Sequence, residues 1–127
     1  MEPRTLLRLE GFAAFVGALA VYFALDGPLW LLAVLALAPD LSMGGYLAGP
    51  RVGSLLYNLF HTYTLPLALA AVAVWSGATL ALYVAAIWVG HIGADRLVGY
   101  GLKYETGFNA THLSTQPAPI DVLTETE

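Results

Sequence analysis

The sequence predicts an all-α polytopic membrane protein in which four transmembrane helices form an up-down bundle. Of its 127 residues, 58% are hydrophobic and only 11% are charged, whereas soluble proteins carry about 25% charged residues. The mean hydropathy of +0.70 excludes an intrinsically disordered chain. Five Lys and Arg residues against nine Asp and Glu residues exclude a nucleic-acid partner, and the absence of cysteine excludes a disulfide-stapled domain.

Four apolar stretches, at about 6–25, 29–48, 52–75 and 79–98, are separated by turn signals. The first ends at Asp26-Gly27-Pro28, the second at Gly49-Pro50-Arg51, the third at Ser76-Gly77 and the fourth before Gly99. About 20 helical residues cross a hydrocarbon core of about 30 Å, and a helix satisfies its own backbone in lipid. Residues 1–105 are therefore predicted to form the transmembrane domain. Residues 106–127 are predicted to be a polar, acidic tail whose end is disordered.

The basic residues predict the orientation of the four helices. The two outer turns, 26–28 and 76–78, contain no Lys or Arg, so all five bases fall on the other side of the bilayer. Positive charge marks the cytoplasmic side, which places both termini in the cytoplasm. The bases are Arg4, Arg8, Arg51, Arg96 and Lys103.

Four ionisable residues lie at one predicted depth. Counting along the alternating helices at 1.5 Å per residue puts Asp40, His61 and His91 at the same level, slightly to the cytoplasmic side of the midplane. Asp95 follows His91 by one helical turn. Because a central Asp costs about 2.5–3.5 kcal/mol on insertion scales, these residues are expected to face each other inside the bundle.

Imidazoles and carboxylates are the ligands that zinc, manganese and non-haem iron use. We expect His61, His91 and Asp95 to be ligands of a divalent metal, zinc or manganese, with Asp40 a fourth ligand or a catalytic general base. Such a site activates water for hydrolysis. Pro39 and Pro66 are expected to free the carbonyls of Leu35 and Thr62 inside their helices. Supporting polar or aromatic positions on the same helix faces are Tyr57, Asn58, Trp88 and Arg96.

Other interpretations of the same residues remain open. They could form a buried network in which Arg96 pairs with Asp40 or Asp95, and the chain would then be a structural membrane subunit or a proton or ion conduit. His61 and His91 could also be the axial ligands of a b-type haem. Gly45 and Gly49 form a GxxxG pattern, which favours close packing within the chain or, as the alternative, a homodimer.

Several motifs in order resemble the bacterial family called domain of unknown function 4260, which consists of small integral membrane proteins. The similar region is about residues 8–113, and Glu105 stands where the family pattern has Pro. The resemblance implies a multi-pass protein of the bacterial cytoplasmic (inner) membrane and no established activity. The motifs are Arg8-Leu9-Glu10-Gly11, Pro39-Asp40-Leu41-Ser42-Met43, Gly45-Tyr46, Gly49-Pro50-Arg51, Tyr57-Asn58 with His61 and Tyr63, His91-Ile92-Gly93 with Asp95-Arg96, and Gly99-Tyr100-Gly101-Leu102-Lys103-Tyr104.

A fainter similarity is to multi-pass inner-membrane proteins described as metal-dependent hydrolases. It consists of Pro39-Asp40, His61 and the His91-x3-Asp95 pair. Those proteins have a further Asp where this chain has Ser42, and a second His where it has Thr62 or Tyr63. The similarity implies hydrolysis with a smaller ligand set, by analogy.

Overall fold

The computed structural model describes residues 2–104 and 107–111 of the chain. Four helical segments, Pro3–Ala24, Leu29–Ala48, Pro50–Ser76 and Thr79–Val98, are long and apolar enough to cross a membrane. The predicted all-α fold with four membrane-spanning helices is confirmed. Large apolar side chains cover the outside, with Leu47 96% exposed and Trp75 89% exposed. Such a surface suits lipid and would be unfavourable in water.

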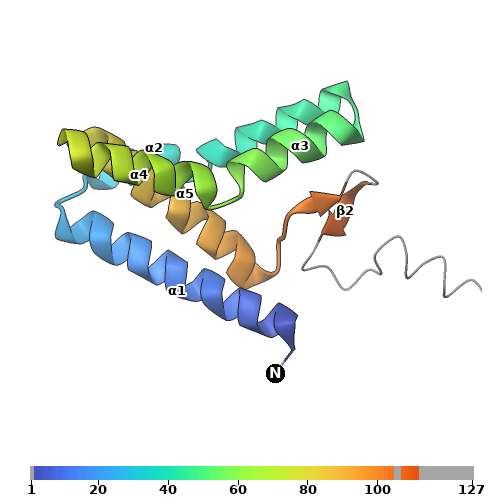
Figure 1. Cartoon of the computed structure of the whole chain (residues 1–127), viewed down its shortest axis with the longest axis horizontal. Coiled ribbons are helices and arrows are strands. Elements are labelled where there is room, and N and C mark those ends of the chain that lie inside the picture. The colour runs from blue at the N-terminus through green and yellow to red at the C-terminus, as the bar shows by residue number, and fades with distance from the viewer. Residues whose placement is uncertain (1, 105–106, 112–127) are drawn as a thin grey trace, which may run out of the picture.

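The first and last spans are unbroken helices that lie side by side (Figure 1). They are α1 (Pro3–Ala24) and α5 (Thr79–Val98). A Cβ atom on Gly93 would lie 2.6 Å from the carbonyl oxygen of Gly11, and one on Gly11 would lie 2.3 Å from the Cβ of Arg96. The two backbones therefore touch where they cross, which is how small residues join helices in lipid. Arg8 adds a hydrogen bond from Nε to the carbonyl of Leu97, at 2.9 Å.

The second span is broken into an α-helix and a long 3-10 helix. The α-helix α2 covers Leu29–Leu35, and the 3-10 helix η1 covers Ala38–Ala48. Pro39 lacks the N–H that would continue the α-helix, and Ser42 Oγ donates to the Pro39 carbonyl at 2.8 Å. A 3-10 helix of 11 residues is unusual, because such helices rarely exceed about four residues and longer ones often mark functional hinges.

The third span is broken as well, between α3 (Pro50–Phe60) and α4 (Thr64–Ser76). Pro66 lies in the first turn of α4, where a missing N–H costs least, so the break falls upstream of it. In Figure 1, α3 and η1 lie side by side as an arm that points away from α4. A Cβ on Gly45 would lie 2.8 Å from Leu56 Cδ1, so this glycine packs within the chain. The homodimer stays a prediction.

A short antiparallel hairpin follows α5. Strand β1 is Lys103–Tyr104 and β2 is Gly107–Thr111, with Lys103 opposite Thr111. This hairpin was not predicted, because residues 107–111 were assigned to the tail. The predicted boundary at 105 and 106 and the predicted disorder after residue 111 lie outside the described residues.

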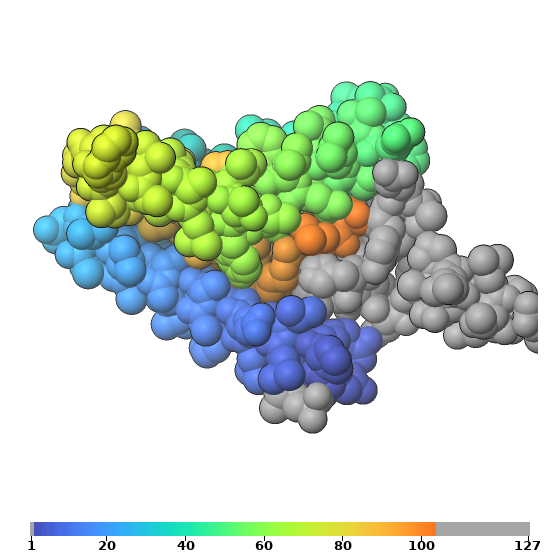
Figure 2. Space-filling view, viewed as in Figure 1, coloured from blue at the N-terminus to red at the C-terminus, as the bar shows by residue number. Residues whose placement is uncertain are grey.

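Helix α5 is the centre of the assembly. It carries seven of the buried residues, among them Ile87, which packs with Tyr22 and Leu31. In the space-filling view only a small part of α5 (orange) is visible between α1 (blue) and the α3–α4 segment (green) (Figure 2). Helices α1, α4 and α2 each contact this helix, whereas α3 contacts η1 and the hairpin.

Candidate metal centre

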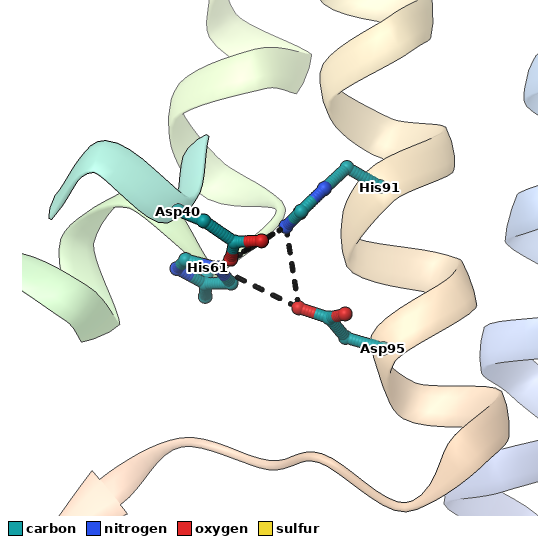
Figure 3. A group of neighbouring side chains, drawn as sticks. All are labelled: Asp40, His61, His91 and Asp95. Carbon is teal, nitrogen blue, oxygen red and sulfur yellow. Dashed lines mark hydrogen bonds and ion pairs between the residues drawn. The ribbon is translucent and has the colours of Figure 1, made fainter. Parts of the chain in front are cut away.

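The four ionisable residues of the predicted layer converge on one point. Asp40 comes from η1, His61 from the break between α3 and α4, and His91 and Asp95 from adjacent turns of α5 (Figure 3). Each offers one ligand atom, and the four atoms lie within 4.8 Å of one another. The structure thus brings together every residue that the sequence proposed as a metal ligand, and these four could hold a metal ion.

Five of the six distances between the ligand atoms lie between 3.1 and 3.5 Å. Asp40 Oδ1 lies 3.1 Å from Nε2 of His61 and 3.1 Å from Nε2 of His91. Asp95 Oδ2 lies 3.5 Å and 3.3 Å from the same two nitrogens. The two Nε2 atoms are 3.3 Å apart. Both imidazoles and both carboxylates therefore point inward at a single small volume.

Backbone carbonyls fix the orientation of both imidazoles. His61 Nδ1 donates to the Tyr57 carbonyl at 2.8 Å, and His91 Nδ1 donates to the Ala36 carbonyl at 2.7 Å. A carbonyl oxygen only accepts hydrogen bonds, so each Nδ1 carries a proton and each neutral ring has its lone pair on Nε2. This is the second-shell pattern that metal-binding histidines normally show. Sequence reasoning pointed to the Leu35 carbonyl, but the one that His91 uses is that of Ala36.

Burial differs between the ligand candidates. The side chain of His61 is 0% exposed and that of His91 is 5% exposed, whereas those of Asp95 and Asp40 are 18% and 32% exposed. The histidines are therefore fixed parts of the interior. Asp40 is the member of the cluster with most access to its surroundings.

Two side chains of α5 satisfy the carbonyls exposed by the break in the third span. Trp88 Nε1 donates to the Phe60 carbonyl at 2.7 Å, and Arg96 Nη2 donates to the His61 carbonyl at 2.7 Å. Lipid offers no partner for such groups. The predicted supporting residues Trp88 and Arg96 thus hold the segment that carries His61, and they do so through its backbone.

Tyr57 and Asn58, the other predicted supporting residues, connect α3 to the segment after α5. The Tyr57 ring stacks on the His61 ring, with centroids 3.8 Å apart and planes 6° apart. Asn58 pairs with the backbone of Lys103, accepting from its N–H at 2.6 Å and donating to its carbonyl at 2.8 Å. The Lys103 Nζ lies 4.8 Å from the centre of the Tyr57 ring, and burial lowers the pKa of this amine. Sequence reasoning missed Lys103 as a neighbour of the site, although a lysine directly after a glycine-rich turn was a visible signal.

Two cavities adjoin the cluster. One, of about 260 Å³, lies among α1, α2 and α5 and has an apolar lining that includes Phe15, Leu19 and Leu32. The other, of about 210 Å³, is lined by Met43, Tyr57, Tyr100 and Lys103. Asp40 and Asp95 line both cavities. The carboxylates therefore stand between an apolar space and a more polar one.

The comparisons with known proteins identify the family. Residues 4–115 match the family described as Domain of unknown function (DUF4260). The chain belongs to this family. No curated protein and no solved structure matches it significantly. The family resemblance seen in the sequence is confirmed, whereas the fainter similarity to metal-dependent hydrolases finds no support in these comparisons.

Proposed function

We propose that this DUF4260 protein is a membrane-embedded metalloprotein in which Asp40, His61, His91 and Asp95 bind one divalent ion, zinc or manganese. The distances between ligand atoms carry the proposal. A tetrahedral ion with bonds of about 2.0–2.2 Å requires ligand atoms about 3.3–3.6 Å apart. Five of the six separations are 3.1–3.5 Å, and all four atoms lie within 4.8 Å of one another. The carbonyls that orient both histidines support it further, because they leave both Nε2 lone pairs directed at the centre.

The reaction we propose for this centre is hydrolysis. A divalent ion supplies a Lewis acid that polarises a carbonyl or phosphoryl oxygen and activates water. Catalytic zinc sites usually keep three protein ligands and one open position. Asp40, the most exposed of the four carboxylates and imidazoles, is the group we expect to give up its position, accept a proton from water and act as the general base.

Two other interpretations fit the geometry less well. A haem between His61 and His91 would need space for a porphyrin, but the Asp40 and Asp95 carboxylates lie within 3.5 Å of both Nε2 atoms. A proton conduit would need polar groups leading away from the cluster. Among the described residues that line the larger cavity, the ionisable ones are Asp40, His91 and Asp95 of the cluster itself, and the others are apolar or glycine.

Elemental analysis of the detergent-purified protein tests the metal proposal. We expect about one equivalent of zinc or manganese in the wild type, and loss of most of it in His61→Ala and Asp40→Asn, because each removes a ligand. Asp26→Asn is the matched control, since Asp26 lies in an exposed turn, and it should retain the metal. A folded wild type without metal would leave the buried polar network as the explanation of the cluster.

We also propose that the protein lies in the bacterial cytoplasmic membrane with both termini in the cytoplasm. The position of the basic residues supports this orientation. A reporter fused after Glu127 should be active only in the cytoplasm, and one inserted at Gly77 only outside. The reverse pattern would overturn the orientation and leave the metal proposal untouched.

A further inference from the structure

The two cavities that meet at the cluster differ in both chemistry and exit. Leu37 lines the apolar cavity and is 70% exposed, so this cavity reaches the surface among the apolar side chains that suit lipid. Tyr100 lines the second cavity and is 59% exposed, so the second cavity opens after the C-terminal end of α5. A ligand that occupies both must be apolar at one end and polar at the other.

The charges around the second cavity indicate the sign of the ligand's polar group. Lys103 lines the second cavity together with Asp40 and Asp95. The lysine and a divalent ion contribute three positive charges, and the two carboxylates contribute two negative ones. The balance is positive when the ion is bound, which favours an anionic group at this position.

We propose that the ligand is an amphiphile with one apolar chain and a phosphate head. Its chain occupies the cavity among Phe15, Leu19 and Leu32, and its phosphate lies between the cluster and Lys103. This inference rests on the proposed function, for which it names the substrate class. In the hydrolysis of such a monoester, the oxygen of water bonds to phosphorus and the bond from phosphorus to the chain oxygen breaks. The chain then leaves as an alcohol with one proton of the water, and inorganic phosphate is released.

The bilayer determines what each half of the ligand contributes. A chain that moves from lipid into an apolar cavity leaves one apolar environment for another, so little hydrophobic free energy is gained. The chain therefore positions the head group, and most of the affinity comes from charge-assisted contacts of the phosphate. Blocking the cavity should impair binding by excluding the chain, whereas removing Lys103 should weaken binding of any phosphate.

Variants of two alanines test the apolar cavity. Ala94 lines it, so Ala94→Phe fills the space and Ala94→Leu fills part of it. Ala71, exposed on α4, gives the matched control Ala71→Phe. In phosphatidylcholine nanodiscs, with empty nanodiscs subtracted, we expect Ala94→Phe to lose about tenfold or more in affinity for dodecyl phosphate, and Ala94→Leu to lose less. Affinity for inorganic phosphate should be unchanged in Ala94→Phe and in Ala94→Leu.

Lys103→Met tests the polar end. It should weaken binding of dodecyl phosphate and of inorganic phosphate by about tenfold, because one charge-assisted contact is lost. Arg4→Met removes a half-exposed cation that pairs with Glu2 at 3.1 Å, and it should change neither affinity. Dodecanol, which lacks the head, should bind no better to the protein than to empty nanodiscs.

Metal content, measured on the same samples, separates the two proposals. If the wild type holds metal but Ala94→Phe binds dodecyl phosphate as well as Ala71→Phe does, the amphiphile proposal is overturned and the metal centre stands. If the wild type holds no metal but Ala94→Phe loses affinity for dodecyl phosphate and Ala71→Phe does not, the apolar cavity stands as the chain site, and both the metal centre and the phosphate position derived from its charge are overturned.

Discussion

Backbone polar groups in lipid need hydrogen-bond partners within the protein. The unbroken pair α1 and α5 provides them differently from the broken spans on either side of Gly49. In the unbroken pair the α-helices continue without interruption over Pro3–Ala24 and Thr79–Val98, and they join through Gly11 and Gly93. In the broken spans, carbonyls at or beside the breaks accept hydrogen bonds from side chains; among them are those of Ala36, Tyr57, Phe60 and His61. The breaks therefore supply the acceptors that position the cluster. The unbroken pair, called the frame below, carries donors on α5 that satisfy carbonyls at these breaks, which lipid could not do.

Breaking the frame should have the largest effect. In Gly93→Ala the new Cβ would meet backbone atoms of Gly11 and Phe15 at 2.6 Å, so α1 and α5 must separate. We expect a loss of about 3 kcal/mol or more in the free energy of unfolding, together with loss of bound metal, measured by denaturation in mixed micelles. Gly17→Ala on α1 is the control, because a Cβ there meets nothing within 4 Å. Equal stability of the two variants would show that the crossing at Gly93 is not a structural contact.

Releasing the broken span from α5 should be the next largest effect. Arg96→Met removes the hydrogen bonds to the carbonyls of His61 and Tyr100, and leaving the buried His61 carbonyl without a partner costs about 1–3 kcal/mol. Because the His61 backbone is then no longer held, its imidazole is displaced from the cluster, and metal affinity should fall by about 10–100-fold. Competition with a zinc-binding dye measures this. Arg4→Met, at a side chain that is 40% exposed, should leave both metal affinity and stability unchanged. A similar loss in Arg4→Met would point to net charge rather than to position.

Trp88→Phe should give a smaller change, confined to the same break. It removes the bond from the indole N–H to the Phe60 carbonyl and keeps an aromatic ring near Phe60, whose ring lies 5.7 Å from that of Trp88. We expect about 1 kcal/mol of destabilisation. We also expect the substitution to accelerate amide hydrogen exchange more at residues 61–63 than in α1. Trp75→Phe is the matched control on an 89% exposed side chain. Exchange that accelerates equally in α1 would mean that the break is not an independent unit.

The sequence could predict the layer because depth in a membrane follows from counting residues. Asp40, His61 and His91 lie on helices that alternate in direction, and a rise of 1.5 Å per residue places them at one level. That count survives the breaks, since the four ligand atoms converge within 4.8 Å. The four spans were predictable for the same reason, because apolar length and turn residues are local properties of the chain.

The acceptors and the neighbours of the site were not predictable in the same way. The proline at position 39 indicated a free carbonyl, but which one is used depends on whether the backbone continues as an α-helix or as a 3-10 helix. Lys103 meets Asn58 across 45 positions of sequence, a contact that only the tertiary fold creates. The hairpin after α5 likewise depends on pairing between residues on both sides of a turn, and its short strands carry no apolar pattern of their own.

The smallest expected effect concerns Lys103, which follows α5 and contacts Asn58 and Tyr57 of α3. It therefore connects the unbroken pair to the broken third span. Burial lowers the pKa of its amine in the folded chain, while the unfolded chain keeps the ordinary value of about 10.4. Between these two values the unfolded chain binds more protons, so the free energy of unfolding should rise slightly with pH in this window. Below the window the charged amine is buried at a constant cost. Lys103→Met retains the apolar stem without the amine, so its stability should lack this rise. Unfolding in mixed micelles from neutral pH to pH values near 10.4 compares the two slopes, and parallel slopes would mean that the amine is hydrated in the folded chain and that the tie to α3 depends on the backbone pair with Asn58 alone.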